Sequence, residues 1–68
     1  MTMAPVSSSN LSSVGYENGT LYIRFHSGRL YAYYNVPVSE YEALMSASSH
    51  GKYFNANIRN LYDYRRIG

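Results

Sequence analysis

Arginine and tyrosine lie close together at several places in the chain, and together these residue types can bind a single strand of nucleic acid. Four short stretches carry the pattern, at residues 22–24, 29–31, 59–62 and 64–66. Arginine holds phosphate groups, and tyrosine rings stack on unpaired bases. The same residues also stack on one another within a protein, where arginine keeps an aromatic surface soluble. The pattern therefore indicates candidates for binding and leaves both roles open.

The C-terminal segment is the densest part of this pattern. Residues 59–67 hold three of the six cations and two of the nine tyrosines. Five of the six cations are arginine, which favours planar, bidentate and stacked contacts. The net charge of +2 permits contact with nucleic acid without requiring it. The residues that we expect to bind nucleic acid or another partner are Arg24, Arg59, Tyr62, Tyr64, Arg65 and Arg66.

Residues that could catalyse a reaction are scarce. His26 and His50 have no cysteine and no acidic neighbour at metal-binding spacing, which argues against a zinc site. Ser49 and Lys52 match the Ser-x-x-Lys spacing of some acyl-transfer enzymes, but the companion motifs are missing and a helix start explains the match better. Paired carboxylates and a phosphate-binding loop are also missing. We expect no enzyme activity, no metal and no cofactor.

The length of 68 residues allows one domain with a small core. Cysteine is absent, which favours a reducing compartment, because secreted domains of this size usually carry disulfides. The first residues lack the basic and apolar regions of a signal peptide, and no apolar run is long enough to cross a membrane. We expect a cytoplasmic protein with no membrane partner. Residues 1–10 are rich in serine and predict a flexible segment before a single domain at 11–68.

The elements that must position the candidate residues begin with three strands. Residues 11–17 precede Asn18-Gly19, the strongest short hairpin signal, and residues 20–26 alternate between apolar and polar side chains. Residues 29–34 form a third strand after Ser27-Gly28, and Pro37 stops the pairing. The pattern predicts an antiparallel meander.

The loop at Ser27-Gly28 leaves the role of Tyr31 and Tyr33 open. A two-residue loop puts both rings on the exposed face with Tyr22 and Arg24. A three-residue loop, with Gly28 in the left-handed position, puts them beside the core residues of the preceding strand. We favour the three-residue loop, because it supplies the core with two large rings instead of a single alanine.

Two helices follow the strands. Ser39 and Glu42 form a capping box, residues 41, 44, 45 and 48 share one face, and Gly51 offers a stop. A short second helix is expected over residues 52–59, with Phe54 and Ile58 one turn apart. Residues 61–67 alternate again and could add a fourth strand or an extended tail along the sheet. The fold class predicted is α+β, with one helix and a short helix packed on one face of the meander.

The chain resembles the KTSC domain family. The resemblance is carried by residues 21–28, the pair Tyr31 and Tyr33 around Ala32, residues 36–37, and the later stretches 47–48, 51–55, 58–59 and 62. It covers about residues 8–67. Each motif is short, but their order and spacing together are specific.

The resemblance implies a small domain found at the carboxyl end of some lysyl-tRNA synthetases and as a separate bacterial or phage protein. The family has no established activity, and RNA binding has been suggested for it. The residue between the two tyrosines of its Tyr-x-Tyr mark is often polar or basic, and here it is Ala32. If Ala32 faces outward, both tyrosines belong to the core.

These observations predict a small non-catalytic module that binds nucleic acid, RNA first, through arginine and exposed tyrosine. The alternative is a phage-type protein-interaction module that inhibits a host nucleic-acid-processing complex, as anti-CRISPR proteins do. In that case the same side chains would bind a host protein complex.

Overall fold

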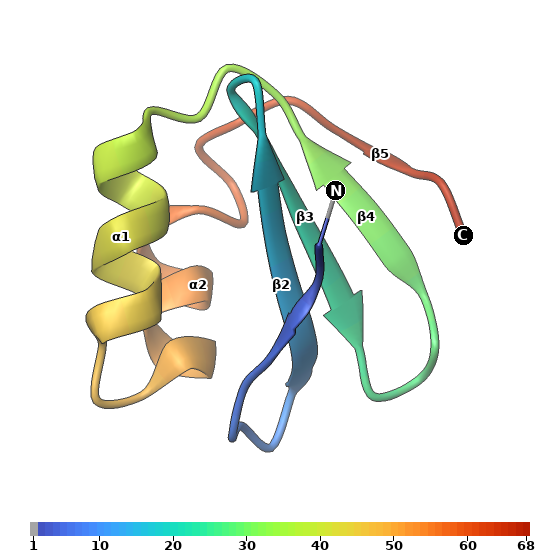
Figure 1. The fold of residues 1–68 in the computed structure, drawn as a ribbon, viewed down its shortest axis with the longest axis vertical. Helices are drawn as coiled ribbons and strands as arrows, with labels where there is room; N and C mark the ends of the chain where they lie inside the picture. The colour runs from blue at the N-terminus through green and yellow to red at the C-terminus, as the bar shows by residue number, and fades with distance from the viewer. Residues whose placement is uncertain (1) are drawn as a thin grey trace.

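The computed structural model describes residues 2–68, which form an α+β domain with a five-stranded antiparallel sheet and two helices (Figure 1). Each strand pairs with the strands next to it in sequence, so the order across the sheet is β1-β2-β3-β4-β5. Both helices lie on the same side of the sheet (Figure 1). The elements are β1 (Ala4–Pro5), β2 (Leu11–Glu17), β3 (Thr20–Phe25), β4 (Leu30–Tyr33), α1 (Val38–Ser46), α2 (His50–Asn57) and β5 (Tyr64–Arg66).

The first hairpin is the one that its sequence predicts. Glu17 pairs with Thr20, and Asn18 and Gly19 between them have φ angles of 51° and 80°. These left-handed conformations match the twist of the two strands, and asparagine and glycine adopt them at low cost. A register shift between Leu11 and Ser13 then lets Leu11 and Val14 both reach the core, although they are three residues apart.

The second hairpin has the three-residue loop. Arg24 pairs with Leu30 and Ile23 with Tyr31, while the amide of Gly28 donates to the carbonyl of Phe25 over 2.9 Å. Gly28 has a φ of 94°, which a residue with a side chain rarely adopts. This register confirms that Tyr31 and Tyr33 lie on the face that carries the core.

The sheet has two more strands than the predicted meander. β5 confirms the fourth strand and pairs with β4, with Tyr33 opposite Tyr64. β1 contradicts the prediction that residues 1–10 form a flexible segment, because two of these residues pair with β2, with Ala4 opposite Val14. The sequence does not signal this strand, since it is only two residues long and contains a proline.

The start of α1 differs from the prediction. The helix begins at Val38, and its N-cap is Pro37, which makes no side-chain hydrogen bond. Ser39 therefore lies inside the helix, and the prediction that Ser39 and Glu42 form a capping box is wrong. The carbonyl of Pro37 accepts the amide of Glu40 over 3.0 Å, so the rigid extended proline starts the helix instead.

The prediction that the first helix stops at Gly51 is also wrong, because Gly51 lies inside α2. α1 already ends at Ser46, and Ser49 caps α2 by accepting the amide of Lys52 over 3.3 Å. This cap confirms the helix-start explanation of the Ser-x-x-Lys spacing. A Cβ atom at position 51 would lie 3.3 Å from Oγ of Ser8, so glycine lets the N-terminal segment approach the helix.

The core lies between the sheet and the two helices. Leu21, Ile23 and Tyr33 point to it from the strands, and Leu44 and Phe54 from the helices. Ile58 follows α2 by one residue and is buried as well, one turn after Phe54. The predicted helical pair is thus part of the core, and it fixes α2 against the strands.

Candidate functional site

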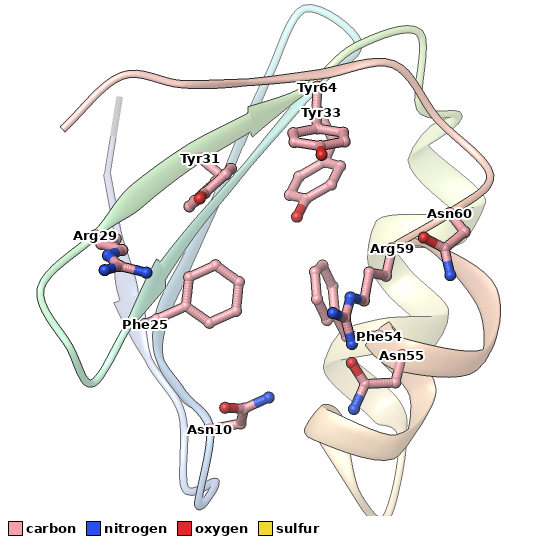
Figure 2. A pocket seen from close by; sticks show the side chains of 10 residues that line it. All are labelled: Asn10, Phe25, Arg29, Tyr31, Tyr33, Phe54, Asn55, Arg59, Asn60 and Tyr64. Carbon is pink, nitrogen blue, oxygen red and sulfur yellow. The ribbon is translucent and has the colours of Figure 1, made fainter.

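A pocket lined by aromatic rings opens at the boundary between the sheet and α2 (Figure 2). Its volume is about 440 Å³. We call it the aromatic pocket. The rings come from β3, β4, α2 and β5, and polar side chains from the N-terminal segment, the second hairpin and the end of α2 surround them. The lining residues are Asn10, Phe25, Arg29, Tyr31, Tyr33, Phe54, Asn55, Arg59, Asn60 and Tyr64.

The rings of the aromatic pocket form a connected cluster. Tyr33 contacts the edge of Phe54, with ring centroids 5.4 Å apart, and lies 5.5 Å from Tyr64. Phe25 contacts Phe54 at 5.7 Å and Tyr31 at 5.6 Å, again with edge-to-face geometry. Such contacts stabilise each ring in one orientation. The wall of the pocket is therefore preformed by the packing that holds the fold.

Two arginines lie on opposite sides of this wall (Figure 2). Arg29 lies in the turn region of the second hairpin, directly before β4, and Arg59 follows α2. Asn55 and Asn60 lie near Arg59 and Asn10 lies below Phe25 (Figure 2), and none of the lining residues within residues 2–68 is acidic. The arrangement combines a cationic rim, hydrogen-bonding amides and exposed ring surface, which suits a ligand that is planar and negatively charged.

The hydroxyl of Tyr33 stays protonated over a wide pH range. Burial is the largest cause that raises its pKa from 10.0 to about 12; neighbouring Tyr31 and Tyr64 act in the same direction, and Arg59 acts in the opposite direction. The side chain is only 4% exposed, so the anionic form loses most of its hydration.

We expect this shift to appear in alkaline unfolding. The pKa of Tyr33 is higher in the folded protein than in the unfolded chain. The protonated hydroxyl therefore makes its full contribution to the free energy of unfolding below pH 10, and this contribution is lost as the pH rises towards 12. Urea unfolding at increasing pH should therefore show a smaller alkaline loss of stability in Tyr33→Phe than in the wild type. An identical loss in the two proteins would contradict the assignment to Tyr33.

The six residues predicted from the sequence do not form one site. Arg59 and Tyr64 line the aromatic pocket. Arg66 lies on the same side of β5 as Tyr64, opposite Tyr31 on β4, and its Nε donates to the carbonyl of Gly68 over 2.9 Å. This side of β5 faces the same way as the pocket wall, because paired residues share a face of the sheet.

Arg24 and Arg65 belong to the other face of the sheet. Arg24 pairs with Leu30, and its guanidinium donates to the carbonyl of Gly28 over 2.9 Å. Arg65 pairs with Ala32, which faces away from the tyrosines on either side of it. Ala32 is itself only 2% exposed, but its place on this opposite face agrees with the core placement of Tyr31 and Tyr33. These two arginines cannot act together with Arg59 on one small ligand.

Tyr62 contributes to structure. Its hydroxyl donates to Oε2 of Glu40 over 3.0 Å, and the hydroxyl of Tyr53 donates to Oε1 of the same carboxylate. Burial and the hydrogen bond to Glu40 raise the pKa of Tyr62, and the hydrogen bond to Glu40 and burial raise the pKa of Tyr53. One carboxylate on α1 thus connects α2 and the C-terminal segment.

Replacing Glu40 with glutamine should lower the melting temperature by several degrees. The amide retains only one acceptor oxygen for the two hydroxyls, and it loses the negative charge that strengthens both hydrogen bonds. Glu42→Gln is the matched control, because Glu42 lies on the same helix and is exposed. Equal melting temperatures for the two variants, measured by circular dichroism, would argue against the connection.

The sequence analysis missed part of the pocket. It did not select Arg29, although Arg29 belongs to the arginine–tyrosine stretch 29–31, and of the five rings that line the pocket it selected only Tyr64. The signal for Arg29 was its position directly after the turn at Gly28, where a side chain remains exposed. The three asparagines carry no pattern that connects positions 10, 55 and 60.

Within residues 2–68, no group of three or more metal-binding side chains comes together. In the same part of the chain, neither helix has the length and apolar character needed to span a membrane.

Comparison with known proteins connects this geometry to a family. The family model of the KTSC domain matches the sequence over residues 7–62. The chain belongs to the KTSC family. A KTSC domain protein from Yersinia pestis has the same fold, with a TM-score of 0.95 at 38% identity, over 98% of this chain and 97% of that one. The family resemblance seen in the sequence is confirmed.

Two other relatives match this chain over very different shares of their own length. An uncharacterized protein of Stutzerimonas stutzeri is 40% identical over 70 residues, which cover 98% of this chain and 99% of that protein. A lysine–tRNA ligase of Nostoc is 38% identical over 48 residues, 71% of this chain but only 9% of the ligase. Sequence similar to this chain therefore makes up nearly all of one relative and a small part of the other.

Proposed function

We propose that this KTSC domain is a non-catalytic module that binds single-stranded nucleic acid, RNA first, at the aromatic pocket. The proposal rests on one pocket that combines five rings with two arginines and, among residues 2–68, contains no acidic side chain. Ring faces stack on unpaired bases and arginine neutralises phosphate, so the two components of single-strand binding are next to each other. The match to part of a lysine–tRNA ligase supports RNA as the first candidate.

The proposal narrows the set of binding residues. Arg59, Tyr64 and Arg66 remain, and Arg29 joins them, because all four lie at the pocket or on its side of the sheet. Arg24 and Arg65 point to the opposite face and are assigned no direct contact. Tyr62 supports the site indirectly through Glu40.

Salt dependence tests this proposal directly. If Arg29, Arg59 and Arg66 neutralise three phosphates of a single strand, the logarithm of the association constant should fall with the logarithm of the salt concentration at a slope of about −2. Arg59→Ala should make the slope shallower by about 0.7, the contribution of one phosphate on a single strand. Arg65→Ala is the matched control with the same loss of charge on the other face, and it should leave the slope almost unchanged.

The measurement is fluorescence anisotropy with mixed-sequence RNA and single-stranded DNA over a series of salt concentrations. Variants must first give the circular dichroism spectrum of the wild type. Failure of both nucleic acids to bind at low salt would reject the proposal. Equal effects of Arg59→Ala and Arg65→Ala would instead move the binding surface away from the pocket.

A second candidate function is protein interaction, as in a phage-type inhibitor of a host nucleic-acid-processing complex. The observation that favours it is the exposure of large apolar side chains along the C-terminal segment: Leu61 is 68% exposed, Tyr64 58% and Ile67 47%. Such residues beside arginine are typical of protein-binding hot spots.

Alanine variants along residues 59–67, tested against a complex captured from the host after nuclease treatment, separate the two functions. A protein partner predicts that a few positions dominate the affinity, and that salt acts mainly on the association rate. Loss of capture upon nuclease treatment would favour the nucleic-acid function.

A further inference from the structure

The size of the aromatic pocket limits what it can hold. A volume of about 440 Å³ is at the small end of the range for small-molecule sites, which is roughly 300–1,000 Å³. This space suits one nucleotide with its base and sugar. The bases of a duplex are stacked on one another, and their faces cannot reach a ring-lined cavity without leaving the stack.

The exposed ring surface is the part that a base would contact. Tyr64 is 58% exposed and lies 5.8 Å from Tyr31, measured between ring centroids. Phe25 and Tyr31 are half-buried, so each still presents part of its surface to the cavity. Because every base has an aromatic face, this contact is tolerant of sequence.

The two pocket arginines are available for phosphate. Neither the guanidinium of Arg29 nor that of Arg59 forms a hydrogen bond or an ion pair within residues 2–68, whereas those of Arg24 and Arg66 each bind a backbone carbonyl. Figure 2 shows Arg29 and Arg59 on opposite sides of the cavity. A nucleotide inside a strand has a phosphate on each side, and this matches the placement of the two cations.

The amides provide contacts for the edge of a base. Asn55 and Asn60 lie near Arg59 at one side of the cavity, and Asn10 lies below Phe25 (Figure 2). Each carboxamide carries a donor and an acceptor next to each other, which is the arrangement that base edges also present.

We propose that the aromatic pocket binds one unpaired base from within a single strand, with the flanking phosphates held by Arg29 and Arg59. This inference rests on the proposed nucleic-acid function and specifies its ligand as a single internal nucleotide. A free nucleoside monophosphate has the same base but only one phosphate group, so it can engage only one of the two arginines.

The test uses short RNA strands of equal length that differ only in their bases. One strand is abasic at every position, and a second has a single base at its centre. We expect the single base to strengthen binding about tenfold, because stacking on aromatic side chains contributes about 1–3 kcal/mol per base. Tyr64→Ala should remove most of this gain, whereas Arg65→Ala, which changes the opposite face, should retain it.

The outcomes separate this inference from the proposed function. Equal affinity for the two strands, both still dependent on Arg59, would overturn the one-base pocket and leave backbone binding in place. Binding of a nucleoside monophosphate as tightly as the one-base strand would overturn the internal-nucleotide form and indicate a free-nucleotide site. If neither strand binds, the proposed function itself is rejected. Loss of the tenfold gain upon Arg29→Ala, in a folded variant, would support the two-arginine arrangement.

Discussion

Replacing Tyr33 with alanine is expected to lower the free energy of unfolding by about 3–5 kcal/mol. The ring is 4% exposed and contacts Tyr31, Phe54 and Tyr64, so its removal leaves a cavity at the centre of the aromatic cluster. Cores of domains below about 70 residues rarely supply more than 3–5 kcal/mol, so this variant should be largely unfolded without stabilising additives. Urea unfolding followed by circular dichroism, with the same stabilising osmolyte present for wild type and variant, measures the effect.

Tyr22→Ala is the matched control, because Tyr22 pairs with Ala32 on the face away from the helices. Its cost should be less than half that of Tyr33→Ala. Tyr33→Phe keeps the ring and should cost about 1 kcal/mol or less, so a foldable variant is available at the same position. Equal losses for Tyr22→Ala and Tyr33→Ala would contradict the assignment of the two faces.

Replacing Phe54 with alanine should destabilise the domain by a similar amount, about 3–5 kcal/mol. Phe54 is the buried side chain through which α2 contacts Phe25 and Tyr33 on the sheet. Without this ring, α2 loses its main apolar contact, and a helix of eight residues is not stable alone. Urea unfolding and the amide exchange of α2 measure the two effects.

Val38→Ala provides the comparison for Phe54→Ala. Val38 is also an apolar residue at a helix, but it is 54% exposed, and its truncation should change stability by less than about 0.5 kcal/mol. If amide exchange in α2 were as slow in Phe54→Ala as in the wild type, another contact would have to hold the helix.

The rings therefore have two roles that compete in any experiment. Tyr33 and Phe54 build the wall of the aromatic pocket and the core of the domain, so their variants report on stability before they report on binding. Tyr64 and Arg59 are exposed and can be changed with little effect on the core. Binding experiments should use the exposed positions, and stability experiments the buried ones.

The candidate site was predictable only in part. Arg59, Tyr64 and Arg66 could be selected from the sequence because arginine and tyrosine crowd the last residues of the chain. The same reasoning selected Arg65, which lies on the other face because side chains alternate along a strand. The start of β5 and its register decide this alternation, and neither is encoded in the local pattern.

The sequence alone determined the features that depend on neighbouring residues. Asn18-Gly19 makes a tight turn because both residues tolerate positive φ, and the apolar alternation in β3 assigns its buried face. Phe54 and Ile58 share one side of a helical segment because they are one turn apart. The family resemblance followed from the order of such short motifs along about residues 8–67, and the family match over residues 7–62 confirms it.

The tertiary structure decided what depends on contacts between distant residues. The second hairpin could form with either loop, and packing against Phe54 favours the register that buries Tyr33. β1 forms because the edge of β2 is open for pairing. A glycine is found inside α2 because Ser8 comes so close to position 51 that a side chain there would crowd it. The aromatic pocket exists for the same reason: Arg29 and Arg59 are thirty residues apart in the chain, and only the packing of α2 on the sheet puts both beside the same rings.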